Sequence, residues 1–429
     1  MKLWDKGYGT DKFVEKFTVG NDRVLDLKLA KYDVQASLAH AKMLEKVGLL
    51  TGKEFLVLEK GLETIRETIE NGTFSIEESF EDVHSKIEFE LTKTAGEAGK
   101  KIHTARSRND QVLVALHLYL KDEIKEIKEN IRQLFETLIR LSEKHKDVLM
   151  PGYTHTQVAM PSSFGLWFAA YAETLIDDII MLNAAADITD QNPLGSAAGY
   201  GSSFPIDRKY TTELLGFATL KYNAIAAQLS RGKLEKTMAF ALASVSGTLS
   251  KLATDMILFL SGNFDFIRFP KELTTGSSIM PHKQNPDVLE LLRAKSNKIQ
   301  SLPVEITLIV NNLISGYHRD FQLLKESVIE AVDQVKENLK IFVFMLDNIE
   351  INDGILERND TYKYLYSVES VNKLVREGIP FREAYKIVGK QILENKYHPE
   401  KTIRHTHEGS IGNLCNEEIR KKFNMFYQK

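Results

Sequence analysis

Cysteine is almost absent from the sequence, since Cys415 is the single cysteine among 429 residues. One thiol excludes an intrachain disulfide and any metal site built from several cysteines. This usage fits a reducing compartment. The N-terminus also lacks the apolar core of a signal peptide, because Lys2, Asp5 and Lys6 interrupt it. We therefore expect a cytoplasmic protein.

The sequence also lacks a long uncharged apolar run and an excess of charge of one sign. Its most apolar stretch, residues 238–260, carries Lys251 and Asp255, which favours a buried helix over a membrane span. The 56 basic and 59 acidic residues give a net charge of −3, so we expect neither nucleic acid nor a membrane as a partner. A hydrophobic content of 43% argues against disorder.

Helical periodicity is the main pattern that is present. Long stretches without strand-like alternation cover residues 111–146, 162–188, 230–261, 287–314 and 322–349. The first has a coiled-coil-like seam of apolar residues at spacings of three and four, namely Ile124, Ile127, Ile131, Leu134, Leu138 and Leu141. Pro303 predicts a kink in the fourth. These stretches predict an all-α protein built around a bundle of long helices.

The chain is too long for one simple core, since single cores stop growing at about 250–300 residues. We place boundaries near residues 105 and 355, which gives an N-terminal helical domain (1–105), a central long-helix domain (106–355) and a small C-terminal helical domain (356–429). Gly378-Ile379-Pro380 predicts a helix end followed by a new helix.

Polar residues gather in two connections on either side of the first long helix. Residues 103–111, HTARSRNDQ, contain two arginines that can donate in pairs to carboxylates. Residues 151–157, PGYTHTQ, place His155 in a connecting loop without apolar periodicity around it. Each has a plainer interpretation, as a helix cap with solvated charges and as a structural histidine.

Two further connections are rich in small residues. Residues 192–201 could bring backbone N–H groups close to an anion or could simply connect two elements. Residues 276–286, GSSIMPHKQNP, hold a lysine, two serines and an asparagine between a glycine and two prolines. A simple turn would explain the prolines but not these polar residues. Because no nucleotide fingerprint or metal-ligand cluster stands out, we expect no cofactor and no metal.

The motif GSSIMPHKQNP resembles the signature of the fumarase/aspartase superfamily, whose members release fumarate by β-elimination. HTARSRNDQ, PGYTH and NPLGSAAGYGSSFPIDR are similar to the argininosuccinate lyase and δ-crystallin branch, and the resemblance covers nearly the whole chain. It implies reversible cleavage of argininosuccinate to arginine and fumarate by general acid/base catalysis, in arginine biosynthesis. It also implies a homotetramer of three-domain subunits with active sites shared between subunits.

The resemblance also implies roles for individual residues. Ser277 would abstract the proton, and Lys283 and Asn285 would stabilise the resulting aci-carboxylate. His155 would act on the leaving-group side, with Glu290 orienting its imidazole. The reverse assignment, with His155 as the base and Ser277 as the acid, stays open.

Other residues would bind the substrate. The succinyl carboxylates would contact Ser107, Arg108, Asn109 and Thr154. The arginine end would contact Tyr317, Gln322 and Lys325, and further family site positions in the N-terminal domain are Asp26 and His84. The chain departs from the family pattern at residues 318–324 and at Asp22, where the family usually has a serine. A carboxylate there would either favour the cationic groups of the substrate or repel its carboxylates.

Three rival interpretations remain. An adenylosuccinate lyase would need a site for a nucleotide phosphate, and no phosphate-loop pattern is present. A non-catalytic δ-crystallin-like protein would share the fold, but the presence of the complete set of implied catalytic residues favours an enzyme. A coiled-coil scaffold explains residues 124–141 and none of the four connections.

Overall fold

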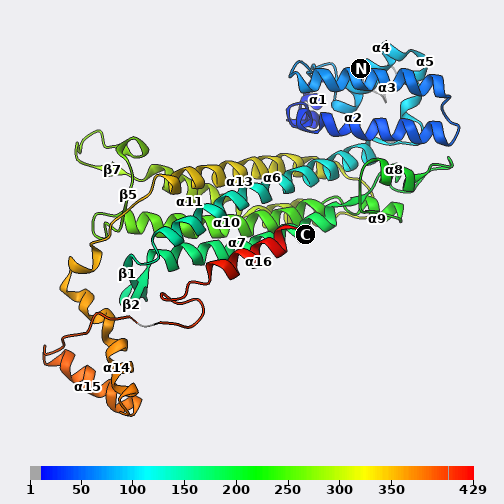
Figure 1. The fold of residues 1–429 in the computed structure, drawn as a ribbon. Coiled ribbons are helices and arrows are strands. Elements are labelled where there is room, and N and C mark those ends of the chain that lie inside the picture. The colour runs from blue at the N-terminus through cyan, green and yellow to red at the C-terminus, as the bar shows by residue number, and fades with distance from the viewer. Residues whose placement is uncertain (1–10, 404) are drawn as a thin grey trace. The chain divides into compact units, whose positions relative to one another are not determined.

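The computed structural model describes residues 11–403 and 405–429. Residues 1–10, which include the segment compared with a signal peptide, lie outside the described residues. Helices dominate the described part, and its short strands pair only as two-stranded ribbons (Figure 1). The prediction of an all-α protein is therefore confirmed. No helix in residues 11–403 or 405–429 is long and apolar enough to cross a membrane.

The chain divides into two compact units. The first unit comprises Met1–Ile127, Met181–Ala243 and Ile299–Gln334, and the second comprises Lys128–Ile180, Ser244–Lys298 and Val335–Lys429. The division into three domains along the sequence, with boundaries near residues 105 and 355, stays a prediction.

The N-terminal part of the first unit is a group of helices around an apolar core. Its elements are α1 (Lys12–Val19), α2 (Asp22–Lys46), α3 (Gly52–Glu70), α4 (Val83–Ala95), α5 (Glu97–Lys100) and the 3₁₀ helix η1 (Lys101–His103). Thr51 starts α3 with a capping box to Glu54, and Asp82 caps α4 by accepting from the Ser85 N–H. Leu44, Leu58 and other fully buried side chains of these helices form the core.

The long helices lie where the periodicity predicts them. They are α6 (Arg108–Lys144), α7 (Phe164–Thr189), α10 (Lys233–Leu260), α11 (Asp287–Ile299), α12 (Leu302–Ile309) and α13 (Leu323–Asp347). Every residue of the predicted α6 seam is at most 2% exposed. Pro303 lies in the first turn of α12, so the expected kink is a break between two helices. Ser163 caps α7 by accepting from the Leu166 N–H.

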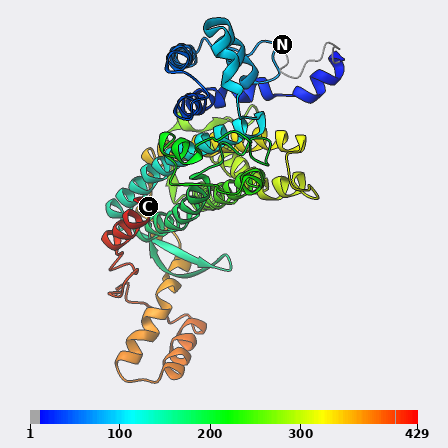
Figure 2. The same ribbon diagram turned by 90° about the vertical axis from the view of Figure 1, so that its right-hand side faces the viewer.

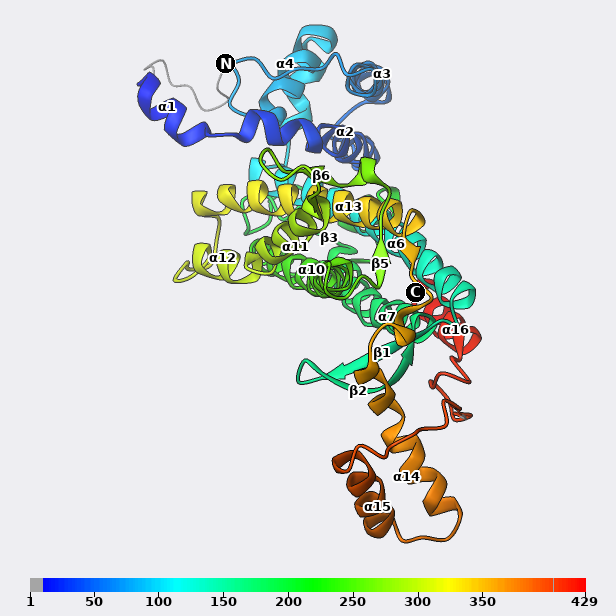
Figure 3. The same cartoon turned by 90° about the vertical axis from the view of Figure 1, so that its left-hand side faces the viewer.

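The connections contain the remaining elements. In the first unit these are β3 (Gln191–Asn192), α8 (Arg208–Leu214), β4 (Thr219–Leu220), α9 (Ala224–Gln228) and η3 (Arg319–Gln322). In the second they are β1 (Leu149–Thr154), β2 (Gln157–Ser163), β5 (Ile267–Arg268), η2 (Lys271–Leu273), β6 (Thr275–Gly276), β7 (Gln284–Asn285), β8 (Glu350–Ile351), η4 (Ile355–Glu357), η5 (Asp360–Tyr366), α14 (Ser367–Arg376), α15 (Phe381–Leu393) and α16 (Asn416–Tyr427). Gly378 follows the end of α14 at a φ of 96°, as the Gly-Ile-Pro motif predicts. Figure 3 shows α14 and α15 as two separate helices.

One connection differs from its prediction. Residues 151–157, expected to be a connecting loop around His155, lie in an antiparallel hairpin in which β1 pairs with β2 (Figure 2). Gly152 and Pro151 concealed the strands, because both residue types usually interrupt them. The register shifts between Pro151 and Tyr153, which accommodates these residues as an irregularity in the ribbon.

Candidate active site

A charged cavity of about 130 Å³ lies in the first unit. Its lining comes from α2, from the residues around the starts of α4 and α6, and from the segment that enters α13. The predicted substrate-binding residues that line it are Asp26, His84, Arg108, Asn109, Tyr317, Gln322 and Lys325. The structure therefore brings together residues from distant parts of the sequence that the resemblance assigned to one ligand.

Lys325 lies between two carboxylates in this cavity. Its Nζ is 2.7 Å from Asp22 Oδ1 and 2.7 Å from Asp26 Oδ1. The two aspartates are four residues apart on α2 and so share a helix face. Burial alone would lower the pKa of Lys325, but the two carboxylates raise it. Burial also raises the pKa of Asp22 to about 6, against the opposing effect of Lys325.

His84 forms a second buried pair. Its Nδ1 lies 2.9 Å from Asp33 Oδ2, and the His84 side chain is only 4% exposed. Burial lowers the pKa of His84, but the contact with Asp33 outweighs this effect and the pKa is raised. The pairing orients the imidazole at the wall of the cavity.

Glu81 joins two arginines of the same cavity. One Glu81 oxygen accepts from Arg108 at 3.0 Å and the other accepts from Arg319 at 2.9 Å. Arg108 also donates to the Ser85 hydroxyl at 2.7 Å. Sequence reasoning missed both Glu81 and Arg319. The charged stretch just before His84 was the available signal, but nothing local indicates that one carboxylate would bridge arginines more than 200 residues apart.

The connections at residues 103–111 and 192–201 meet at Asp110. This buried carboxylate accepts from the backbone N–H of Ser107 at 2.8 Å and from those of Gly195 and Ala197 at 3.0 Å each. Burial raises the pKa of Asp110 to about 6, although these N–H donors lower it. The N–H groups of the Gly-rich connection therefore bind a protein anion, and this contact fixes the half-buried Ser107 at the start of α6.

A buried ion pair anchors the segment that carries Arg319 and Gln322. Glu235 accepts from Arg231 Nε at 2.9 Å and from the Gly232 N–H at 2.6 Å, and both charged side chains are at most 2% exposed. Arg231 also donates to the backbone carbonyl of Phe321 at 2.7 Å. The ion pair thus holds η3 in place.

The second unit carries the remaining predicted site residues on the β1–β2 hairpin, on the β6–β7 loop and in α11. Thr154 ends β1, and His155 and Thr156 form the turn of the hairpin with φ values of 54° and 58°. Left-handed backbone at both central residues is the geometry of a two-residue hairpin turn. All three residues are exposed.

Residues 276–286, GSSIMPHKQNP, form a loop that is closed by the pairing of β6 with β7. The Ser277 hydroxyl accepts from the Met280 N–H at 3.2 Å, and Asn285 Nδ2 donates to the Gly276 carbonyl at 3.2 Å. Lys283 is exposed on this loop, and Glu290 is exposed in α11. The pairing brings Ser277, Lys283 and Asn285 onto one short loop. Among the described residues, no ion pair joins Glu290 to His155.

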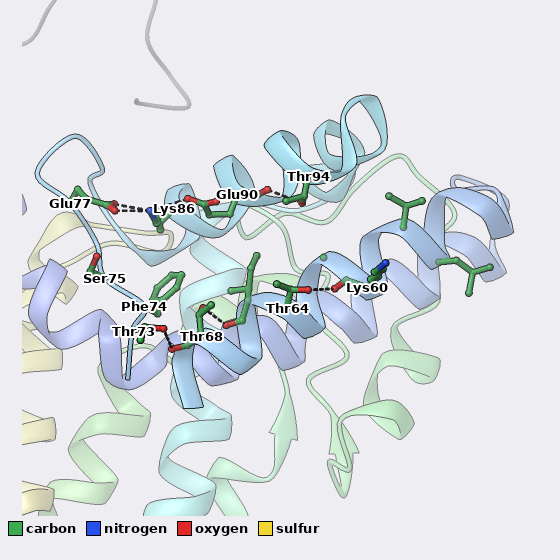
Figure 4. Close-up of a pocket in the computed structure, with 14 residues that line it drawn as sticks. Lys60, Thr64, Thr68, Thr73, Phe74, Ser75, Glu77, Lys86, Glu90 and Thr94 are labelled. Carbon is green, nitrogen blue, oxygen red and sulfur yellow. Dashed lines mark hydrogen bonds and ion pairs between the residues drawn. The ribbon is translucent and has the colours of Figure 1, made fainter. Parts of the chain in front are cut away.

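A larger pocket, of about 710 Å³, lies elsewhere in the first unit between α3, α4 and residues 73–77 (Figure 4). None of the predicted site residues lines it. Its buried Lys86 is held by Glu77 and Glu90, at 2.8 and 3.0 Å. The smaller cavity, which the predicted substrate-binding residues line, is therefore the better candidate site. No group of three or more potential metal ligands occurs in the described residues.

Comparison with known proteins identifies the family. A family model described as lyase matches residues 6–301. The argininosuccinate lyase of Bacteroides fragilis is 56% identical over 98% of this chain and 94% of its own length. That of Thermotoga neapolitana is 46% identical over 92% of this chain and 99% of its own length.

Solved structures share the fold. An EDDS lyase in complex with formate matches with a TM-score of 0.79 and 22% identity, over 98% of this chain and 90% of that one. A fumarate lyase:delta crystallin from Brucella melitensis matches with a TM-score of 0.75 and 17% identity, over 97% and 94%. The fold, the grouping of the predicted residues and the near full-length relatives agree, and the chain belongs to the argininosuccinate lyase family of lyases.

Proposed function

We propose that this protein is an argininosuccinate lyase that cleaves argininosuccinate reversibly to arginine and fumarate, without a cofactor, in arginine biosynthesis. The observation that carries the proposal is the 56% identity to argininosuccinate lyases over nearly the whole chain. The charged cavity supports it, because it holds residues suited to both carboxylates and cationic groups.

The elimination needs a base, a stabiliser for the aci-carboxylate, carboxylate clamps and a proton donor for the leaving nitrogen. We assign the proton abstraction to Ser277 and the stabilisation to Lys283 and Asn285, which share the β6–β7 loop. An isolated serine hydroxyl is a weak base, so its activation requires nearby cations and N–H donors. His155, oriented by Glu290, would serve the leaving group, and the reverse assignment of base and acid stays an alternative.

The substrate would be bound by the first-unit cavity and its neighbours. Arg108 carries a bidentate guanidinium and, with Ser107, Asn109 and the second unit's Thr154, would contact the succinyl carboxylates. Glu81 would hold Arg108 in place. We assign the arginine end to Tyr317, Gln322 and Lys325, with Asp26 and His84 completing this part of the site.

We further propose that the enzyme is a homotetramer with active sites shared between subunits. In the single chain, Ser277 is half-buried, whereas His155, Lys283 and Glu290 are exposed, and further subunits would enclose them. The long helices also expose large apolar side chains, as expected of an interface. These include Ile180, Met181, Phe240, Leu258, Leu291, Val304, Leu308 and Phe344.

The tetramer can be tested by light scattering after gel filtration, where the expected mass is four times the subunit mass of 48.7 kDa. Shared sites can be tested by co-expressing Ser277→Ala and Lys325→Ala chains. If each site draws these two residues from different subunits, mixed tetramers contain some intact sites and recover activity that neither variant has alone. A stable, active monomer would contradict the proposal.

The reaction itself can be tested by the ultraviolet absorbance of fumarate, with argininosuccinate and adenylosuccinate offered separately. We expect fumarate from argininosuccinate alone. Release of fumarate from adenylosuccinate instead would support the β-elimination but would contradict argininosuccinate as the substrate. A folded tetramer that releases no fumarate from either substrate would favour the δ-crystallin-like structural alternative. The single cysteine is consistent with our further proposal that the enzyme works in the cytoplasm.

A further inference from the structure

The charges around Lys325 alternate in sign. The side chains of Asp22 and Asp26 flank its ammonium group, each with one oxygen at 2.7 Å. An ammonium group has three donors, so two contacts leave a third. Asp22, Lys325 and Asp26 thus place a positive charge next to negative ones. This arrangement is complementary to an α-amino acid, whose ammonium and carboxylate groups are neighbours. It does not match a succinyl group, which carries two carboxylates and no ammonium.

The two aspartates are not equivalent. Asp26 is 1% exposed, and its second oxygen accepts from the Val83 N–H at 3.2 Å. Asp22 is 13% exposed, and within the described residues no hydrogen bond reaches its second oxygen. Of these two carboxylates, Asp22 is therefore the one that can still accept a hydrogen bond from a ligand.

The cavity is also a suitable size for one end of the substrate. At about 130 Å³ it accommodates several water-sized groups, which is enough for an ammonium and a carboxylate on one carbon. A carboxylate of the ligand next to Asp22 would be repelled, whereas an ammonium there is attracted. Lys325 lines the same cavity, and its third donor can bind the adjoining ligand carboxylate.

We infer that Asp22 is a specificity-determining residue that accepts the α-ammonium group of the amino-acid end of the ligand, beside a carboxylate bound by Lys325. The inference rests on the proposed function and deepens it. It resolves the question that Asp22 raised in the sequence, in favour of attraction to a cationic group. The ligand's other cationic group, the guanidinium, is distinguished from the α-ammonium by the titrations below.

The test compares the wild-type protein with Asp22→Asn, which keeps the shape of the side chain and removes its charge. Calorimetric titration measures the affinity for three amino acids: L-arginine, L-citrulline, which lacks the guanidinium charge, and Nα-acetyl-L-arginine, which lacks the α-ammonium. We expect Asp22→Asn to lower the affinities for L-arginine and L-citrulline alike by about 10- to 100-fold, which is the range for loss of a charge-assisted hydrogen bond. Nα-acetyl-L-arginine should bind Asp22→Asn at least as tightly as the wild type, because it has no α-ammonium to lose a partner and its carboxylate is no longer repelled.

Asp333→Asn is the matched control, since Asp333 forms an ion pair with Lys28 between the same two helices but does not line the cavity. It should leave all three affinities unchanged. Loss of L-arginine affinity without loss of L-citrulline affinity would make the guanidinium the partner of Asp22 and overturn the inference. Equal affinities of wild type and Asp22→Asn for every ligand would overturn it as well.

The inference about Asp22 and the proposed function can fail independently of each other. If the wild type releases fumarate from argininosuccinate while Asp22→Asn binds amino acids normally, the inference fails and the function stands. If the wild type releases no fumarate but its L-arginine affinity depends on Asp22, the function fails and the inference stands.

Discussion

Replacement of Ser277 by alanine is expected to lower kcat for argininosuccinate by about 10²- to 10⁴-fold, the usual contribution of a positioned acid or base. The substitution removes the hydroxyl that either assignment requires. It leaves the residues that line the first-unit cavity unchanged, so KM should change little. Steady-state measurement of fumarate release over a range of substrate concentrations separates the two parameters.

Ser261→Ala is a suitable control for this substitution. Ser261 is a half-buried serine of the same unit, as Ser277 is, and its hydroxyl donates to the Leu258 carbonyl at the end of α10. Its replacement should leave kcat within about twofold, because surface substitutions usually change little. A Ser277→Ala enzyme that kept a kcat close to that of Ser261→Ala would remove Ser277 from the chemistry.

Replacement of Glu235 by alanine should destabilise the protein by about 3–5 kcal/mol, the typical cost of leaving a buried charge without its partner. Arg231 would lose its ion pair, and the Gly232 N–H would lose its acceptor. Because Arg231 also holds the Phe321 carbonyl, we expect the η3 segment to loosen and KM to rise. Urea denaturation, compared at one protein concentration, measures the loss of stability.

The double variant Arg231→Met/Glu235→Leu tests the cause. It removes both charges together and replaces them with apolar side chains of similar size, which in buried pairs is often close to neutral. We expect it to recover most of the stability lost in Glu235→Ala. A double variant as unstable as the single one would show that packing at these positions, rather than the unpaired charge, explains the loss.

Local patterns made the long helices predictable. The three- and four-residue spacing from Ile124 to Leu141 is a property of neighbouring residues, and the same holds for the break at Pro303. The first-unit cavity was predictable only through the resemblance, which named residues from α2 to α13 without showing why they should meet. Their local sequence provides no such signal, because a helix face becomes a cavity wall only through its partners.

The features that escaped sequence reasoning depend on contacts between distant residues. Glu81 is unremarkable in the sequence, and only the fold gives it Arg108 and Arg319 as partners. Asp110 looked like one acidic residue of a helix start, but it binds N–H groups about 85 residues away. The β1–β2 hairpin was missed for a different reason, since a strand that contains proline and glycine is recognised only through its partner strand.

The turn at the tip of that hairpin has a consequence for engineering. Left-handed backbone costs an ordinary L-residue roughly 1–2 kcal/mol, and a β-branched residue such as Thr156 tolerates it especially poorly. Selection for heat resistance alone would therefore favour the Asn-Gly pair that such turns prefer and would replace His155 along with Thr156. A library for thermostable variants should keep position 155 fixed and vary position 156, where glycine relieves the backbone without removing an imidazole.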